Sequence, residues 1–257
     1  MSVPGARVAV VTGAAGGIGG ATCRRLAADG FAVACLDISE DSARAVAAGL
    51  PGTDGLPGTD GLAGAIGVAA DVRDAASVRQ AAARIRAELG TPWLLVNAAG
   101  VFSIQRLPDL TEDEWDRIID TNLRGPFLTC REFLPDMISA RDGCIVNVAS
   151  TAGVHGGRQR AAYCASKGGL VQLTRSLAID HGPDGVRVNC VCPGLIDTAM
   201  ADWIRADSQA LARWEATVPA RRIGTAEEIA DAIAFLASPG AGYVQGAVLM
   251  ADGGSTA

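Results

Sequence analysis

The sequence predicts an α/β fold: a single-domain, doubly wound parallel sheet of about seven strands with helices on both faces. Short apolar runs rich in β-branched residues alternate with longer amphipathic segments, which is typical of repeated β-α-β units. The short runs are apolar throughout, as expected for strands covered on both faces. No linker or change in composition divides residues 1–257, so we expect one domain.

The elements follow from this alternation in chain order. We expect strands at 7–12, 32–37, 66–70, 93–96, 143–149, 186–192 and 246–250. We expect helices at 17–29, 40–49, 74–89, 111–140, 161–181 and 225–237.

Two segments interrupt the alternation. Residues 50–61 hold Leu-Pro-Gly-Thr-Asp-Gly twice in tandem, which is too rich in glycine and proline for a helix or a central strand. We expect a mobile surface insertion there, and a tolerated duplication rather than a functional element. Residues 194–224 carry Met200, Trp203 and Trp214 at roughly helical spacing. That stripe is either core packing or part of a lid over a ligand.

Composition excludes several classes of function. The net charge is −6 without a basic stripe, so we expect no nucleic-acid partner. No apolar stretch of about 18 residues is present, which predicts no membrane span. The N-terminus lacks the features of a signal peptide. The seven cysteines are scattered without a C-x-x-C pair, so we expect a reducing cytoplasmic setting and no metal site.

The first expected strand leads into a glycine-rich turn, Thr12-Gly13-Ala14-Ala15-Gly16-Gly17-Ile18-Gly19. Such a turn lets the backbone approach a pyrophosphate, and the following helix offers free N–H groups and a favourable dipole. A glycine-rich turn alone is a weak signal, but its place between a strand and a helix at the start of the series favours a dinucleotide site.

Polar residues end the next three strands. Asp37 lies just over 20 residues after the glycines, where an acid accepts hydrogen bonds from the adenosine ribose and repels a 2′-phosphate, so NAD is favoured over NADP. Asp71-Val72 and 97–100 (Asn-Ala-Ala-Gly) fall on the same edge, with Asp71 placed to meet the adenine amino group. The alternatives are a helix cap for Asp37 or Asp71 and a plain turn for 97–100.

Ser150, Tyr163 and Lys167 concentrate the chemistry. Lys167 is the single lysine of the chain, and it follows one of only two tyrosines by four residues on a helical pattern. An ammonium near a phenol favours phenolate, which predicts a lowered Tyr163 pKa and a proton-transferring tyrosine. Ser150 would hold the substrate oxygen, and Asn122 would anchor a water that passes protons to Lys167. Tyr-x-x-x-Lys pairs also occur on solvated helices, so the spacing alone is not specific.

Together these motifs resemble the classical short-chain dehydrogenase/reductase family over essentially the whole chain. The resemblance rests on the glycine-rich turn, residues 97–100, Asn122, Ser150, Tyr163-x-x-x-Lys167, Pro193-Gly194, Thr198 and the ending Asp252-Gly253-Gly254. It implies a Rossmann-like sheet, and catalysis by Asn122, Ser150, Tyr163 and Lys167. It also implies a homotetramer, or a homodimer, built through helices like 111–140 and 161–181 and the C-terminal segment.

The resemblance also extends the expected cofactor site. A residue like Thr198 binds near the nicotinamide carboxamide, Ile18 and 191–193 line the nicotinamide, and Lys167 bonds its ribose. We count as cofactor-binding Gly13, Gly17, Ile18, Gly19, Asp37, Asp71, Val72, Asn97, Ala98, Gly100, Tyr163, Lys167, Pro193, Gly194, Ile196 and Thr198.

We therefore expect an NAD-dependent enzyme that moves a hydride between a secondary alcohol or ketone and nicotinamide. The alternatives are a 3-oxoacyl-thioester (acyl-carrier-protein) reductase, a class that usually uses NADPH, and a non-catalytic NAD-binding regulatory protein. Met200 and Trp203 suggest an apolar or ring-bearing small-molecule substrate, and His155 is a further candidate contact. We expect Arg158 and Arg160 to be solvated or at a subunit contact.

Overall fold

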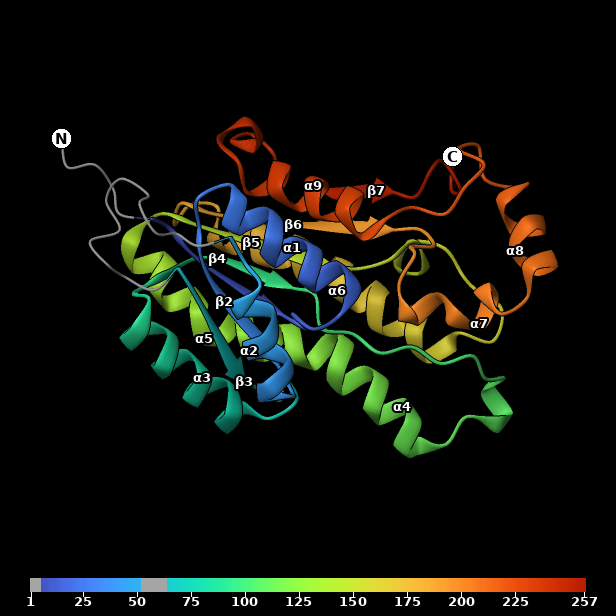
Figure 1. Cartoon of the computed structure of the whole chain (residues 1–257), viewed down its shortest axis with the longest axis horizontal. Helices are drawn as coiled ribbons and strands as arrows, with labels where there is room; N and C mark the ends of the chain where they lie inside the picture. The colour runs from blue at the N-terminus through green and yellow to red at the C-terminus, as the bar shows by residue number, and fades with distance from the viewer. Residues whose placement is uncertain (1–5, 52–63) are drawn as a thin grey trace.

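The computed structural model describes residues 6–51 and 64–257. Within them, seven strands form one parallel sheet in the order β3-β2-β1-β4-β5-β6-β7 (Figure 1). The strands are β1 (Val8–Thr12), β2 (Ala32–Asp37), β3 (Ala65–Ala69), β4 (Pro92–Asn97), β5 (Gly143–Val148), β6 (Val186–Pro193) and β7 (Val248–Ala251). The predicted α/β class and doubly wound sheet are confirmed. The order reverses between β1 and β4, where open sheets of this kind bind ligands.

Helices cover both faces of the sheet. The longer ones are α1 (Gly17–Ala28), α2 (Glu40–Ala48), α3 (Ala75–Glu88), α4 (Glu112–Ile119), α5 (Gly125–Ala140), α6 (Ala161–His181) and α9 (Ala226–Ala237). Helices α1 and α9 pack over one face, and α3, α5 and α6 pack over the other (Figure 1). The strands are buried between these layers, which explains their continuous apolar character.

The expected helix over 111–140 is interrupted. Helix α4 ends at Ile119, a π-helical turn covers Asp120–Arg124, and α5 begins at Gly125. A π turn adds one residue to the turn and is frequent at functional sites. The expected strand at 246–250 instead begins at Val248, because Gly246 adopts a φ of +66° and turns the chain before it.

The segment at 194–224 folds into two short helices, α7 (Asp202–Arg205) and α8 (Ser208–Glu215), beside the carboxyl ends of the strands (Figure 1). Most of the tandem repeat expected to form a mobile insertion, residues 52–61, lies outside the described residues. No helix within 6–51 and 64–257 is both long and apolar enough to cross a bilayer.

Candidate active site

The glycine-rich turn is compact because its glycines lack side chains. Gly13 has a φ of +66°, and a Cβ on it would lie 2.7 Å from the Cα of Ala99. A Cβ on Gly19 would overlap the Gly13 carbonyl oxygen, and one on Gly17 would overlap the Thr198 side chain. Helix α1 therefore starts directly behind the turn, with the N–H groups of its first turn available to a ligand.

Thr12 connects this turn to the end of β4. Its Oγ1 accepts hydrogen bonds from the backbone N–H groups of Ala98 and Ala99, both at 3.1 Å. The stretch 97–100 is therefore fixed beside the glycines rather than being an independent turn. The sequence analysis did not single out Thr12 for this contact, because a threonine that ends a buried strand carries no distinctive signal.

Asp37 faces the glycine-rich turn from the end of β2. Its Oδ2 accepts a hydrogen bond from the Ala15 N–H at 3.0 Å, and its Oδ1 accepts one from the Ser39 N–H at 3.3 Å. The N-cap of α2 is Ser39, so the alternative in which Asp37 caps that helix is wrong. Asp37 lines the groove beside the glycines.

Asp71 is paired with a residue that the sequence analysis did not consider. The Arg73 guanidinium donates to both carboxylate oxygens, at 3.0 Å from Nε to Oδ1 and 2.8 Å from Nη2 to Oδ2. Hydrogen bonding to Arg73 holds the pKa of Asp71 below its ordinary value, against the effect of burial. Asp74, and not Asp71, caps α3, so the helix-cap alternative is wrong here as well.

These elements border a groove of about 420 Å³. Its lining includes predicted cofactor residues: Gly13, Gly17, Ile18, Gly19, Asp37, Asp71, Val72, Ala98, Gly100 and Thr198. It also includes Arg117, whose guanidinium is paired with Glu114.

Asn97 does not line the groove, which corrects its assignment to the cofactor site. Its side chain is buried, donating to Asn147 Oδ1 at 2.8 Å and accepting from Thr129 Oγ1 at 2.7 Å. A buried amide has to satisfy its polar atoms within the protein, and these neighbours engage both ends of this one. Asn97 therefore joins β4 to β5 and α5, and only the residues after it reach the ligand side.

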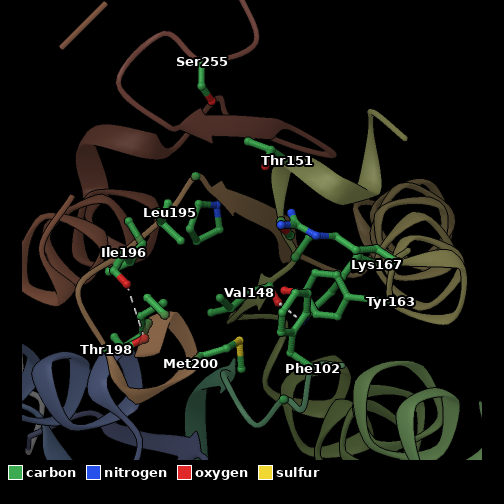
Figure 2. A pocket seen from close by; sticks show the side chains of 18 of the residues that line it. Phe102, Val148, Thr151, Tyr163, Lys167, Leu195, Ile196, Thr198, Met200 and Ser255 are labelled. Carbon is green, nitrogen blue, oxygen red and sulfur yellow. Dashed lines mark hydrogen bonds between the residues drawn. The ribbon is translucent and has the colours of Figure 1, made fainter. Parts of the chain in front are cut away.

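A second cavity, of about 190 Å³, adjoins the groove and is lined by three of the four predicted catalytic residues, Ser150, Tyr163 and Lys167 (Figure 2). Ser150 follows β5, whereas Tyr163 and Lys167 lie on the first turns of α6. Pro193 at the end of β6, and Gly194, Ile196 and Thr198 in the segment after it, also line the cavity. Ile18, Ala98, Gly100, Thr198 and Met200 border both spaces, so one ligand can extend from the groove into the cavity.

Gly100 keeps the junction between the two spaces open. A Cβ on it would lie 3.5 Å from Asn122 Oδ1 and 3.6 Å from Lys167 Nζ. Any side chain at position 100 would therefore project beside the ammonium and occupy part of this junction. The structure thus leaves a space the size of a side chain where groove and cavity meet.

Tyr163 and Lys167 are both buried, and burial favours the neutral form of each. Burial raises the pKa of Tyr163, with the Ser150 hydroxyl and the Arg160 charge acting in the opposite direction. Burial lowers the pKa of Lys167 from 10.5 to about 8. The lysine Nζ donates to the Val148 carbonyl at 2.8 Å and lies 5.8 Å from the centre of the tyrosine ring. The pKa of Tyr163 is therefore raised in the protein alone, and not lowered as expected, because desolvation outweighs the Ser150 hydrogen bond and the Arg160 charge.

Asn122 lies in the π turn, and its side chain is fully engaged by protein atoms. Its Oδ1 accepts from the Val101 N–H at 2.8 Å, and its Nδ2 donates to the Val101 carbonyl at 2.9 Å and to Ser166 Oγ at 3.2 Å. Ser166 Oγ donates in turn to the Tyr163 carbonyl at 2.8 Å. The amide thereby positions the stretch after β4 against α6. The role of Asn122 in holding a water beside Lys167 stays a prediction.

Two of the three predicted substrate residues line the cavity. Met200 and Trp203 do, with Met200 opposite Tyr163 in Figure 2, but His155 is exposed and borders neither space. His155 lies in the loop after Ser150, which carries it out to solvent, so its assignment is corrected. Arg158 is exposed as expected, whereas Arg160 lines the cavity, against expectation.

Phe102 was missed by the sequence analysis. Its ring packs edge-on against Tyr163 with the centroids 4.9 Å apart. It is one of several large apolar residues between β4 and α4, and nothing in the sequence distinguishes it. Within the described residues, no group of three or more His, Cys, Asp or Glu side chains is placed to hold a metal ion, and all seven cysteines are free thiols.

Comparison with known proteins agrees with this architecture. The family model described as enoyl-(acyl carrier protein) reductase matches residues 13–256. The 2-(R)-hydroxypropyl-CoM dehydrogenase of Xanthobacter autotrophicus is 39% identical over 98% of this chain and 99% of its own. The cis-4-hydroxycyclohexanecarboxylate dehydrogenase of Sinomonas cyclohexanicum is 41% identical over 98% of this chain and 97% of its own.

A solved structure shows the same relationship in three dimensions. A short-chain type dehydrogenase/reductase from Mycobacterium marinum superposes with a TM-score of 0.88 at 32% identity, covering 98% of this chain and 96% of that one. Together with the Tyr163-x-x-x-Lys167 pair beside a glycine-rich turn, these matches show that the chain belongs to the short-chain dehydrogenase/reductase family of oxidoreductases.

Proposed function

We propose that this enzyme is an NAD-dependent alcohol dehydrogenase or ketoreductase in which Tyr163 transfers the proton. One observation carries the proposal: Ser150, Tyr163 and Lys167 line a cavity that continues into the groove of the glycine-rich turn. A substrate oxygen in the cavity and a nicotinamide at the junction would then lie side by side.

The groove fits a dinucleotide. The glycine-rich turn and the start of α1 would hold the pyrophosphate, and Asp71 is proposed to meet the adenine. Asp37 has one hydrogen bond to each carboxylate oxygen and keeps lone pairs for the two ribose hydroxyls. Its charge would repel a 2′-phosphate, and the nearby cations Arg73 and Arg117 are paired with carboxylates. These contacts support NAD over NADP.

In the proposed mechanism, side chains that line the cavity hold the substrate oxygen and transfer its proton. Ser150 and Tyr163 would both hold the substrate oxygen, with Tyr163 accepting its proton on oxidation and returning one on reduction. Lys167 would bind the ribose next to the nicotinamide and favour the phenolate while it is charged. Bound NAD⁺ supplies the hydride acceptor and a further positive charge. Phe102, Met200 and Trp203 would exclude water from this step.

The relatives favour a secondary alcohol as substrate. Both curated relatives are named as dehydrogenases of hydroxylated compounds, and this chain retains the side chains needed for such a reaction. A further relative, the 3-oxoacyl-(acyl-carrier-protein) reductase of Escherichia coli, is 38% identical over 96% of this chain and favours a 3-oxoacyl-thioester reductase as the second candidate. A preference for NADP⁺ would distinguish that class.

Replacing Tyr163 by phenylalanine tests the proposal. Phenylalanine keeps the aromatic ring but lacks the hydroxyl that would transfer the proton. We therefore expect kcat to fall by about 10²–10⁴-fold, with the affinity for NADH nearly unchanged. Tyr243→Phe is the matched control, because Tyr243 is the only other tyrosine and is fully exposed. If Tyr163→Phe turned over at the rate of this control, the catalytic assignment of Tyr163 would be overturned. If the unmodified enzyme bound NADH without any turnover, the result would favour a non-catalytic protein.

We also propose that the enzyme assembles as a homotetramer in the cytoplasm. Exposed apolar side chains on α4, α5 and α6, namely Trp115, Phe127 and Ile179, support packing of these helices against a second copy. The free cysteines suit a reducing compartment. Sedimentation equilibrium would measure the assembly, and a monomer at micromolar concentration would refute it.

A further inference from the structure

The cavity around Tyr163 combines apolar walls with a single arginine. Its large lining side chains are Phe102, Met200, Trp203 and Trp214, and no Asp or Glu is among the described residues that line it. The two cations are Lys167, which the proposed mechanism uses, and Arg160, which it does not. Among the described residues that line the cavity, which also include Ser150 and Thr151, Arg160 is the one charged group without a role in the proposed mechanism, so its presence requires a physical reason.

The backbone fixes Arg160 at the N-terminus of α6, the helix that carries Tyr163. Arg160 is the N-cap residue of α6, three positions before Tyr163. The preceding residue, Gln159, has a φ of +59°, and its carbonyl accepts a hydrogen bond from the Gln105 N–H at 2.8 Å. Arg160 itself bridges to Gln105. A left-handed non-glycine residue costs free energy, so this turn holds position 160 at the expense of local strain.

The Arg160 guanidinium contacts aromatic rings instead of a carboxylate. Its Cζ lies over Phe102 at 5.3 Å and over Trp203 at 5.2 Å from the ring centroids. Within the described part of the chain it makes no ion pair, in contrast to Arg73, Arg86 and Arg117. Stacking orients a guanidinium and leaves its N–H edge available. An arginine held in this way is preorganised for a planar or tetrahedral oxyanion, which it binds through two parallel hydrogen bonds.

We infer that Arg160 binds an acidic group of the substrate, so that the enzyme acts on secondary alcohols or ketones that carry a carboxylate or sulfonate on an apolar body. This inference rests on the proposed function and names its substrate class. Phe102 contacts both Tyr163 and Arg160, so one aromatic ring lies between the proton-transferring group and the cation. The substrate would span a similar gap, with its hydroxyl at Tyr163 and its anion at Arg160.

The experiment compares matched substrates: 1-phenylethanol carrying a para carboxylate, carboxamide or sulfonate. With NAD⁺, we expect the unmodified enzyme to prefer the acids. Arg160→Gln should reduce kcat/KM for the acids by about 10–100-fold more than for the carboxamide, mainly through KM. Carboxylate and sulfonate in parallel show which oxyanion fits. Arg158→Gln is the matched control, an exposed arginine two positions away.

Reversal of the charge provides a second variant. Arg160→Glu should lose the acids and gain turnover of the para-aminomethyl analogue, a result that a merely structural residue would not give. An equal loss for acid and carboxamide in Arg160→Gln would overturn the inference. The same loss in Arg158→Gln would overturn it as well, since it would reflect the net charge of the loop.

Binding separates this inference from the proposed function. Benzoate and benzamide are titrated into the enzyme with NADH present, and the fluorescence of Trp203 and Trp214 reports occupancy of the cavity. Benzoate binding that is about 10–100-fold weaker in Arg160→Gln supports the anion site even if none of the alcohols is oxidised. Equal benzoate binding by both proteins refutes it, while turnover of neutral alcohols would leave the proposed function intact.

Discussion

For Tyr163 and Lys167, the protonation states that the proposed chemistry needs are opposite to those that burial favours. The proposed reaction would need a phenol that can lose its proton and an ammonium beside it, whereas burial raises the pKa of the first and lowers that of the second. A buried ammonium with a pKa of about 8 is half charged at about pH 8. Burial in the protein alone therefore favours the neutral forms of Tyr163 and Lys167. A bound cation or an incoming anion would shift their protonation equilibria.

Lys167→Met should separate stability from activity. Below pH 8 the lysine is protonated in both the folded and the unfolded chain, and the folded state bears the desolvation cost. Between pH 8 and 10.5 only the unfolded chain keeps the proton, so the stability of the unmodified enzyme rises with pH in this window.

We therefore expect Lys167→Met to be more stable at pH 7, by up to about 3 kcal/mol, and to lose this advantage by pH 10.5. Urea unfolding at both pH values measures the difference, and turnover should be lost at each. If the stability of Lys167→Met relative to the unmodified enzyme were lower at pH 7 than at pH 10.5, desolvation could not be the cause of the lowered Lys167 pKa.

Asp37→Asn tests the coenzyme assignment at a single group. The amide keeps the shape of the side chain and removes the charge that would repel a 2′-phosphate. We expect the affinity for NADH to fall by about 10-fold or more and the affinity for NADPH to rise, as measured by nucleotide fluorescence. Asp41→Asn, an exposed acid on α2, is the control. Unchanged selectivity in Asp37→Asn would remove the basis for preferring NAD.

At the residue scale, sequence reasoning named side chains that the fold brings together at one cavity, and missed the contacts that support them. Tyr163 and Lys167 could be predicted because a four-residue helical spacing is local. Asn97, Phe102 and Arg160 could not, because their surroundings come from distant segments: Asn97 turns inward to β5 and α5, and Arg160 reaches rings at 102 and 203. Such contacts depend on tertiary packing, which no periodicity encodes.

At the element scale, the π turn between α4 and α5 is the main departure from prediction. The π turn inserts one residue and shifts the helical phase once within 111–140, and a single shift is difficult to recognise in the spacing of apolar residues. The consequence is functional, because Asn122 lies in this turn and bonds both polar atoms of the Val101 backbone. The extra residue thus places the side-chain amide of Asn122 between the end of β4 and α6.

The turn after β5 is a second element whose position matters. Gly153 packs so closely on α6 that a Cβ there would lie 2.7 Å from the Lys167 carbonyl oxygen. Gly153→Ala should push the Ser150 turn away from Tyr163 and reduce kcat by about 10²-fold, as expected for a misplacement near 1 Å. NADH affinity should change little.

Gly156→Ala provides the matched control for this displacement, because nothing lies within 4 Å of a Cβ at position 156. Steady-state kinetics and NADH titration of both variants make the comparison. Full activity of Gly153→Ala would show that this contact does not set the distance between Ser150 and Tyr163.

At the scale of the whole molecule, the sheet order brings the two halves of the site together. The glycine-rich turn follows β1 and Ser150 follows β5, yet both lie at the carboxyl edge, on either side of the reversal between β1 and β4. The alternation of strands and helices predicted this edge, because parallel strands place all their carboxyl ends on one side. The course of 194–224 over the cavity was not predictable, since its stripe fitted core packing equally well.

The most direct test of the central claim is absorbance at 340 nm with secondary alcohols of cyclic, aromatic and aliphatic type, using NAD⁺ and NADP⁺ in parallel. We predict reduction of NAD⁺ at a rate far above that of NADP⁺. A clear preference for NADP⁺ would contradict the role of Asp37 and favour the thioester reductase. Failure of every alcohol to reduce either coenzyme, in an enzyme shown to bind NADH, would contradict the assignment as an alcohol dehydrogenase.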